Sequence, residues 1–502
     1  MTAWERVDPR LVLVGASWPV GPVVGVVVFD GWSLPAVITL SSLIFTGSVV
    51  GGVYVLRWAT TRYRVTATAF EVRSGLVFRR ARSVALDRVR GVDVSAEPLH
   101  RLFGLATVVV STGEGGLRLD GVTRARAERL RDRLRPAGGE VRLAAFDWAW
   151  LRYGSLTFWS VGGVGVVMGG AYRVLDSFGV KPYELGFVRE VYFFFAGLPV
   201  WAAVGVLVSG VVVLGACGST AWFVETWWDF RLSRSGDTFQ VRRGLLTTRS
   251  MTVDRARVRG VQVTEPLLLR PVRAARTNAV AVGLGTAEDR STAPKSALLP
   301  PAPLALAWHV AEETLGAPVS SDVSTPVPVA SDGCTPALVA LPLALLRHPR
   351  AALRRRLGRV PLVVLPPVAV VGGLGWWLSP FLVHIAWVAG LMGLVAGVWL
   401  AFDAYRSLGH GVDGEFVVMR SGTFARRTVV LRRAGVIGWQ VSQSPFQRRA
   451  GLATLILATA AGVNAYRVHD VLVADAVDLG RWAVRGVQLS GSLSGSLSGS
   501  ST

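Results

Sequence analysis

The sequence contains almost no lysine and almost no cysteine. Of its 54 basic residues, only Lys181 and Lys295 are lysines, and the rest are arginine. The two cysteines, Cys217 and Cys334, are too few for a disulfide framework and match no spacing of metal ligands. Charged residues make up 17% of the chain, against about a quarter in ordinary soluble domains. These shortages argue against a purely soluble protein and against a disulfide-stabilised one.

Recognisable catalytic motifs are also missing. The chain has no GxSxG nucleophile elbow, no phosphate-binding P-loop, no HExxH motif and no paired-cysteine metal spacing. Its six histidines are scattered, and no two are four residues apart. We therefore expect no catalytic residue, no cofactor, no cofactor-binding residue and no metal ligand. A membrane enzyme with an unfamiliar site is an alternative that stays open.

Long uncharged apolar runs are abundant. Hydrophobic residues make up 51% of the chain, and the mean hydropathy is +0.44. A run of about 18 or more apolar residues indicates a transmembrane helix. Six such runs lack Asp, Glu, Lys and Arg, at residues 11–29, 34–56, 154–172, within 191–223, 360–378 and 381–402. A cleavable signal peptide is an alternative for the first run, but a second run follows almost at once. We predict six spans, arranged as three helical hairpins.

The placement of the basic residues predicts the orientation of these spans. Cations near the ends of membrane helices are retained preferentially in the cytoplasm, and the chain has a net charge of +21. If both termini are in the cytoplasm, only two tight turns and residues 173–190 lie outside. The only basic residues in these segments are Arg173, Lys181 and Arg189. We predict a multi-pass protein of the cell (inner or plasma) membrane with both termini cytoplasmic.

One sequence unit occurs three times, each time after a predicted hairpin. Each copy has a glycine after a polar or basic residue, where a turn between two strands is expected. It also has a glycine inside an alternating strand, which indicates a bulge or sharp bend. The first set is Gly75, Gly244 and Gly422, and the second is Gly91, Gly260 and Gly438. A repeat in fixed order predicts three copies of one structural unit.

Periodicity within a copy predicts mainly strands followed by one helix. Apolar residues alternate around residues 63–72, 83–86, 89–94, 107–111 and 116–120. The period then changes to that of a helix, with Val122, Ala125, Leu130 and Leu134 on one face. Matching helices are expected at 303–315 and 475–484. About seven short strands and one helix suggest a small barrel or a sandwich with the helix closing one end.

The order of these residues resembles bacterial pleckstrin-homology-like membrane proteins of the YdbS/YdbT type. The resemblance rests on a Gly-Leu/Val step, a basic pair, Arg-Val-Arg-Gly-Val-x-Val, Pro-Leu and Arg-x-x-Gly-Leu-Ala-Thr. Three copies with hairpins are similar to the longer, YdbT-like members. The second copy departs from the pattern after Pro266, where it lacks Gly-Leu-Ala-Thr.

The resemblance implies three repeats of a two-span helical hairpin followed by a small pleckstrin-homology-like (PH-like) β-barrel with a C-terminal helix. It also implies a membrane protein without assigned catalysis, a smaller YdbS-like membrane protein as a partner and a role in envelope defence. The expected segments are hairpin 1 at 11–57, PH-like domain 1 at 58–145, hairpin 2 at 151–222, PH-like domain 2 at 223–316, a linker with a basic juxtamembrane segment at 317–358, hairpin 3 at 359–402, PH-like domain 3 at 403–489 and a disordered tail at 490–502.

A cluster of arginines, Arg354, Arg355, Arg356 and Arg359, lies just before the fifth predicted span. Each cation close to a membrane surface attracts anionic lipid headgroups by about 1 kcal/mol, although such a cluster can also serve only to fix topology. Nucleic acid is not expected as a partner, because the arginines lack interleaved aromatic residues. We expect a non-enzymatic scaffold whose cytoplasmic modules bind a partner, one another or the lipid bilayer. The alternative is an envelope-defence factor that exports or sequesters membrane-active peptides.

Overall fold

A computed structural model describes residues 4–17, 19–29, 34–75, 80–86, 89, 91–111, 116–134, 140–156, 159–177, 186–282, 296–316 and 345–484. The chain divides into two compact units, Met1–Ala256 and Arg257–Thr502, and each is described by itself. The predicted linker around 317–336 and the predicted tail at 490–502 lie outside the described residues.

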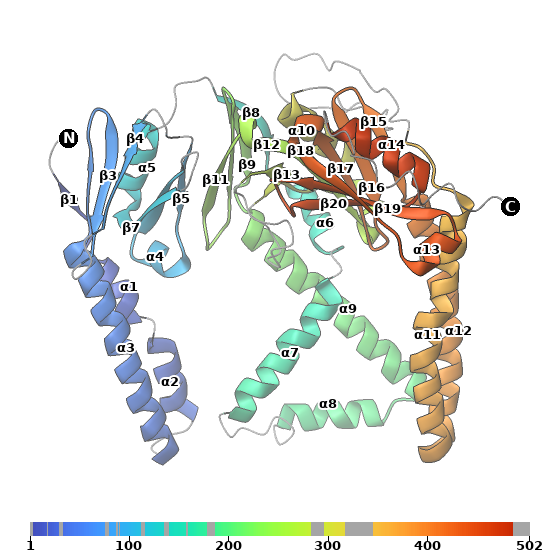
Figure 1. The fold of residues 1–502 in the computed structure, drawn as a ribbon. Helices are drawn as coiled ribbons and strands as arrows, with labels where there is room; N and C mark the ends of the chain where they lie inside the picture. Colours follow the sequence, from blue (N-terminus) through green and yellow to red (C-terminus); the bar gives the residue numbers. More distant parts are fainter. Residues whose placement is uncertain are drawn as a thin grey trace. The chain divides into compact units, whose positions relative to one another are not determined.

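The first unit begins with a β-sandwich, which we call module 1 (Figure 1). One antiparallel sheet has the order β1 (Glu5–Arg6), β2 (Arg62–Val65), β3 (Ala69–Ser74), β4 (Arg80–Ala85). The other has the order β5 (Gly91–Ser95), β6 (Leu105–Ser111), β7 (Gly116–Thr123). The short helix α4 (Pro98–Leu102) joins β5 to β6, and α5 (Arg124–Leu134) packs against β5, β6 and β7. Alternate strand residues such as Phe70, Leu105 and Leu119 are buried in the core.

Module 1 confirms the predicted combination of short strands and one closing helix, and it is a sandwich. Within the described residues no sheet closes into the barrel that the family resemblance implies. The helical face also differs from the prediction. Helix α5 begins only at Arg124, so Val122 belongs to β7, and the buried face consists of Ala127, Leu130 and Leu134, while Ala125 is exposed.

Each repeat begins before its hairpin. Strand β1 pairs with β2 across the first hairpin, and β8 (Glu140–Ala145) pairs with β9 (Arg231–Ser235) across the second. At the third, Leu346 forms an isolated bridge with His410 of β15 (Gly409–Asp413). A hairpin returns the chain to where it entered, so the flanking segments can pair. Residues 140–145, which lie within the predicted range of domain 1, thus pair with a strand that follows the second hairpin.

The strands of the second repeat, which we call module 2, are divided between the units. In the first unit, β8 and β9 form a sheet with β10 (Thr238–Arg243) and β11 (Arg249–Asp254), in the order β11-β10-β9-β8. In the second unit, β12 (Val258–Pro266), β13 (Ala274–Ala281) and β14 (Ala297–Pro303) follow, and α10 (Leu304–Leu315) packs against β12 and β13. The predicted domain 223–316 thus contains strands from both units, and its bounds stay a prediction.

The third repeat, module 3, lies wholly in the second unit. Its strands β15, β16 (Phe416–Ser421) and β17 (Ala425–Arg432) join those of module 2 in a six-stranded sheet with the order β14-β13-β12-β17-β16-β15. A second sheet contains β18 (Val436–Ser442), β19 (Leu452–Thr459) and β20 (Ala465–Leu472), with the short helix α13 (Pro445–Arg449) before β19. Helix α14 (Val473–Ala483) follows β20, so the helices predicted at 303–315 and 475–484 are confirmed.

Four helices are long and apolar enough to cross a membrane, within the part of the chain that the structure describes. They are Ala36–Thr60 of α3 (Leu34–Thr60), α9 (Val200–Trp227), α11 (Arg350–Leu378) and α12 (Pro380–Arg406). The first predicted run instead forms two shorter helices, α1 (Leu11–Ser17) and α2 (Val20–Phe29). The third forms α7 (Trp159–Ser177), and α8 (Gly186–Ala196) precedes α9. The count of six spans stays a prediction.

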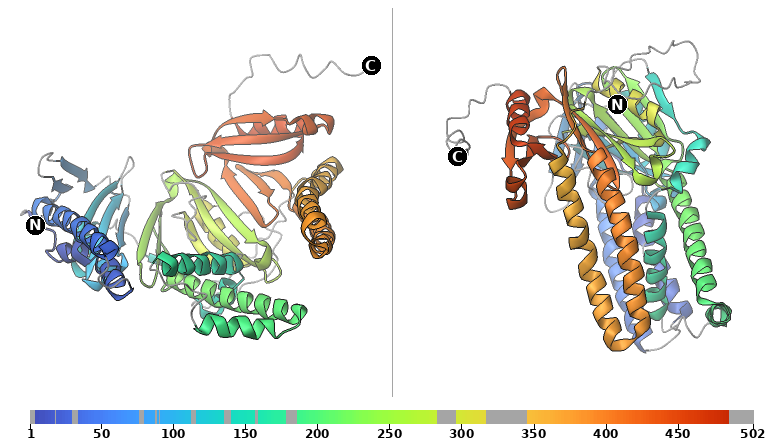
Figure 2. Two further views of the ribbon diagram at one scale, coloured as in Figure 1. Left: turned by 90° about the horizontal axis from the view of Figure 1, so that it is seen from below. Right: turned by 90° about the vertical axis from the view of Figure 1, so that its right-hand side faces the viewer.

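Helices α11 and α12 lie side by side along their lengths (Figure 2). Gly390, Gly393 and Gly397 of α12 each face a valine of α11, and a methyl group at Gly397 would lie only 2.5 Å from a side-chain carbon of Val360. Small residues permit this approach, as is typical of membrane helix pairs.

Candidate functional site

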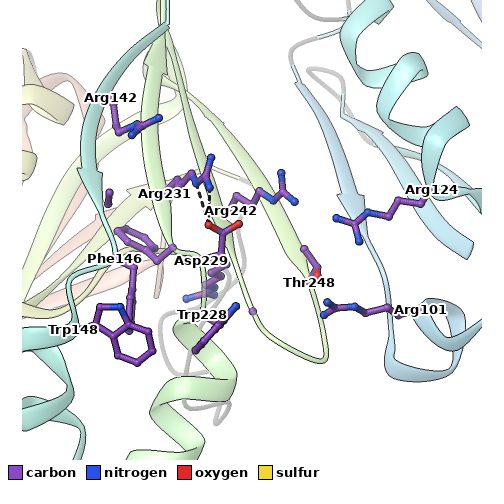
Figure 3. A pocket seen from close by; sticks show the side chains of 14 residues that line it. Arg101, Arg124, Arg142, Phe146, Trp148, Trp228, Asp229, Arg231, Arg242 and Thr248 are labelled. Atoms are coloured by element: carbon purple, nitrogen blue, oxygen red, sulfur yellow. Dashed lines mark hydrogen bonds and ion pairs between the residues drawn. The ribbon is translucent and has the colours of Figure 1, made fainter. Parts of the chain in front are cut away.

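The first unit contains a cleft of about 490 Å³ that is unusually rich in arginine (Figure 3). Six of its lining residues are arginines and only one is acidic. The lining consists of Arg101, Arg124, Arg142, Ala145, Phe146, Trp148, Trp228, Asp229, Phe230, Arg231, Arg242, Arg243, Gly244 and Thr248.

One wall of the cleft is built where α9 ends and the sheet of module 2 begins. Asp229 has a left-handed backbone (φ 47°), which turns the chain sharply from α9 into β9. The Gly244 N–H donates to the Trp228 carbonyl at 2.8 Å, and the Phe146 N–H donates to the Phe230 carbonyl at 2.8 Å. These bonds fix the end of β10 and the end of β8 against the turn. Gly244 itself needs a left-handed backbone (φ 109°), which explains the recurring glycine at this turn.

The opposite side of the cleft comes from module 1. Arg101 lies on α4 and Arg124 is the first residue of α5, and Figure 3 shows both side chains directed toward the cleft. The Ala96 N–H donates to the Thr248 carbonyl at 2.9 Å, which joins the two modules beside the cleft. The site therefore exists only where two successive repeats meet.

Only part of the positive charge in the cleft is compensated by carboxylates. Asp229 accepts hydrogen bonds from Arg231 at 2.8 and 3.1 Å, and Arg124 lies 3.3 Å from Glu128. Among the ion pairs of the described residues, none includes Arg101, Arg142 or Arg242. Guanidinium groups without carboxylate partners bind phosphate and carboxylate oxygens through paired N–H donors. The cleft is therefore suited to an anionic ligand.

Arg243 differs from its neighbours because it is buried. Its guanidinium lies 4.3 Å from the ring centre of Trp227. Burial, with a smaller contribution from repulsion by Arg249, lowers the pKa of Arg243 to about 10. The side chain is therefore still protonated at neutral pH, and it supports the cleft wall from behind by stacking on the last turn of α9.

The arginines that the sequence singled out for lipid contact lie elsewhere, at the start of α11. Arg354 and Arg359 are exposed, whereas Arg355 and Arg356 bind the carboxylate of Asp470. Asp470 has a side chain only 3% exposed and also accepts a hydrogen bond from Gln447 at 3.1 Å. Two members of the cluster thus anchor the membrane hairpin to module 3. None of the four lines the cleft.

Sequence reasoning did not find the cleft. Its one local signal is the aromatic and charged stretch Trp227–Phe230 directly after an apolar run, followed by the basic pair Arg242 and Arg243. Arg101 begins the recurring Arg-x-x-Gly-Leu-Ala-Thr motif, but neither this motif nor the position of Arg124 indicates a cleft, because the cleft depends on the contact between modules. Within the described residues no group of three or more His, Cys, Asp or Glu side chains could hold a metal ion.

Comparison with known proteins gives a consistent result. A family profile described as "Bacterial PH domain" matches residues 20–138, 185–296 and 360–485. The transmembrane protein YdbT of Bacillus subtilis (strain 168) is 20% identical over 458 residues, which cover 85% of this chain and 86% of that protein. No solved structure matches significantly. These matches confirm the resemblance drawn from the repeat, and because the family profile covers more than half of the chain, the protein belongs to the bacterial PH domain family.

Proposed function

We propose that this membrane protein is a non-enzymatic scaffold whose arginine-lined cleft binds the headgroup of an anionic phospholipid. The observation that carries the proposal is the cleft between modules 1 and 2, in which Arg101, Arg142 and Arg242 have no carboxylate partner among the described ion pairs. A phosphate group is the common anion whose oxygens match several guanidinium groups at once.

The position of the cleft favours a lipid over a soluble anion. Trp228 directly follows α9, one of the helices long enough to span a membrane, and it lines the cleft. Trp148, on the same wall, is 61% exposed. Tryptophan is enriched at the level of lipid headgroups, where its ring is partly in apolar and partly in polar surroundings. A ligand in this cleft would therefore lie at the depth of the headgroups.

We extend the proposal to the start of α11, where exposed Arg354 and Arg359 would contact the same leaflet. Anionic lipids give the cytoplasmic leaflet its negative surface potential, so arginines that bind such lipids would face the cytoplasm. We therefore propose that both termini are cytoplasmic. A reporter that is active only in the cytosol, fused after Thr502, should give a signal. The same reporter inserted within residues 173–190 should be silent, and the reverse pattern would refute this orientation.

The positive charge of the cleft favours one of the two functions that the sequence left open, the scaffold, over the other, an envelope-defence factor for membrane-active peptides. Membrane-active peptides that carry basic residues would be repelled by the cleft, so sequestration of such peptides there is disfavoured. The scaffold is therefore the better-supported function. The smaller YdbS-like membrane protein that the resemblance implies is a proposed partner of this scaffold.

Lipid binding can be tested on the full-length protein in detergent by native mass spectrometry with phosphatidylglycerol and phosphatidylcholine. Arg101→Ala/Arg242→Ala removes two cleft cations, and a loss of about 1 kcal/mol for each weakens phosphatidylglycerol binding roughly 30-fold. The matched control Arg427→Ala/Arg467→Ala removes two exposed arginines outside the cleft and should leave binding unchanged. Equal binding of the two lipids, or equal binding by both double variants, would refute the proposal.

A further inference from the structure

Successive modules in this chain join through the edges of their sheets. In the second unit, β12 of module 2 pairs antiparallel with β17 of module 3, from Gly260 opposite Leu431 to Pro266 opposite Ala425. We call this edge pairing a junction. Glu265 and Arg426 lie opposite each other in it and form an ion pair at 3.8 Å.

The first unit contains the start of the same junction. There β5 of module 1 lies beside β11 of module 2, and Ala96 forms a bridge with Thr248. When Gly91 is aligned with Gly260, and Gly244 with Gly422, Ala96 and Thr248 fall at the positions of Glu265 and Arg426. The two junctions therefore share one register, and the register is a property of the repeat.

In module 3, the strand that corresponds to β5 and β12 has no strand paired to its free edge among the described residues. Strand β18 corresponds to β5 and β12, and it is the end strand of its sheet, paired only with β19 among the described residues. Residues of β12 from Gly260 to Val263 are buried by the pairing, whereas β18 exposes Gln440 and Ser442, and Ile437 is 64% exposed. An end strand with an exposed isoleucine is a template for another strand.

A glycine in β18 indicates what approaches this edge. A Cβ at Gly260 would lie 2.3 Å from the carbonyl oxygen of Val430, so β12 needs a glycine where β17 comes close. Gly438 occupies the same place in β18, yet a Cβ there would meet nothing within 4 Å, and its φ is not positive. Among the described residues nothing packs where a Cβ at 438 would lie, and the irregular pairing of β18 with β19 beside Gly438 does not put this glycine in a left-handed backbone. A strand that approached as β17 approaches β12 would, however, require a glycine there.

In module 1, the strand that corresponds to β11 and β17 also has a free edge among the described residues. Strand β4 corresponds to β11 and β17, and it is the end strand of the sheet β1-β2-β3-β4. Its residues Ala81, Arg82 and Ser83 are exposed, whereas the equivalent residues of β17, Thr428 to Val430, are buried in the junction. One chain therefore carries both halves of a third junction, on its first and last modules.

We propose that β18 of one copy of this protein pairs with β4 of a second copy in the register of the internal junctions. Gly438 would then lie opposite Val84, and Gln440 opposite Arg82. Because β18 has no charged residue, the arginines of β4 would meet no like charge directly across the pairing. This contact uses different surfaces on the two copies, so it joins them into a row or a ring.

The geometry of the first unit is compatible with such a row. Helices α3 and α9 leave modules 1 and 2 on the same side of that unit (Figure 1). A further module added by the same junction would keep its hairpin directed toward the same membrane. The contact does not involve the arginine-lined cleft, so it is independent of lipid binding.

Disulfide cross-linking in membranes tests the pairing. In a background of Cys217→Ser/Cys334→Ser, two differently tagged full-length proteins, one with Arg82→Cys and the other with Gln440→Cys, are produced together and oxidised. Residues opposite each other in antiparallel strands lie within the Cα distance that a disulfide spans. We expect a cross-linked pair containing both tags. Cross-linking of either variant with itself, a cross-link only to a different protein, or no cross-link would overturn the proposal.

The variant Gly438→Val distinguishes docking from folding. Its side chain has open space in the single chain but would collide with the backbone of a docked β4. We expect at least a tenfold loss of the mixed cross-link with an unchanged melting temperature. Arg467→Val, on an exposed position of β20, serves as the matched control and should cross-link normally. Undiminished cross-linking of Gly438→Val would contradict the register.

Discussion

The replacement Asp470→Asn removes the carboxylate that ties the third hairpin to module 3. Asp470 is buried and binds Arg355 and Arg356, and its Oδ2 lies 3.5 Å from a terminal nitrogen of Arg356. Gln447 donates to the other carboxylate oxygen. Asp470 has a left-handed backbone (φ 60°), a conformation that Asn tolerates as well as Asp does. The substitution therefore removes charge without adding backbone strain.

The size of the effect follows from the burial of the arginines. Their side chains are only 13% and 16% exposed, so the substitution leaves two largely desolvated cations without an anion. Removing one partner of a buried ion pair costs about 3–5 kcal/mol. In a folding unit of this size, 1 kcal/mol changes the melting temperature by roughly 2–4 °C. We expect Asp470→Asn to lower it by about 6–20 °C.

Thermal unfolding of the full-length protein in detergent, followed by tryptophan fluorescence, measures this change, because module 3 contains Trp439 and Trp482. Asp478→Asn, on an exposed position of α14, is the matched control and should melt like the unaltered protein. Combining Asp470→Asn with Arg355→Met and Arg356→Met should restore part of the loss, since no buried charge is then left unpaired. A melting temperature of Asp470→Asn within 2 °C of the unaltered protein would refute the reasoning.

Three further predictions follow from packing and charge. Burial lowers the pKa of His348 to about 4, below its value in an unfolded chain, so stability should be full above about pH 6.5 and fall toward pH 4. Melting temperatures measured between pH 7.5 and 5 should show this fall, and His348→Gln should reduce it. An equal dependence of the melting temperature on pH in both proteins would contradict the assignment of the fall to His348. Gly260→Val would collide with the carbonyl of Val430 and should destabilise the second unit by at least 1–3 kcal/mol, measured by denaturant unfolding. Arg270→Ala leaves Asp403, 2.5 Å away, without its partner, and should increase protease cleavage of the second unit; unchanged cleavage would count against a role for this ion pair.

Local sequence patterns predicted most elements correctly. Uncharged apolar runs found the long helices α3, α9, α11 and α12, because burying charge in lipid is expensive wherever it occurs. Alternation and recurring glycines found the strands, and the change of period found α5, α10 and α14. The recurring order of residues led to the family. All of these signals act between neighbours in the chain.

Patterns of this kind could not predict which edges pair. Strand β8 falls within the range 58–145 predicted for domain 1, although it pairs with β9 beyond the second hairpin. The junction of β12 with β17 joins residues more than 150 positions apart, and β-edges carry little sequence information about their partners. Nor did such patterns predict that the strands of module 1, as far as the structure describes them, form two open sheets and not the barrel that the family resemblance implies.

By itself, the sequence determined a membrane protein of three repeats, because hydropathy and periodicity are set by where each residue meets water, lipid or core. Only the tertiary structure decided what the arginines do. Arg355 and Arg356 have the same side chain as Arg101 and Arg242, yet the first two bind a buried carboxylate and the others line a cleft. A charge has no fixed role until the fold supplies its neighbours, and those neighbours come from distant parts of the chain.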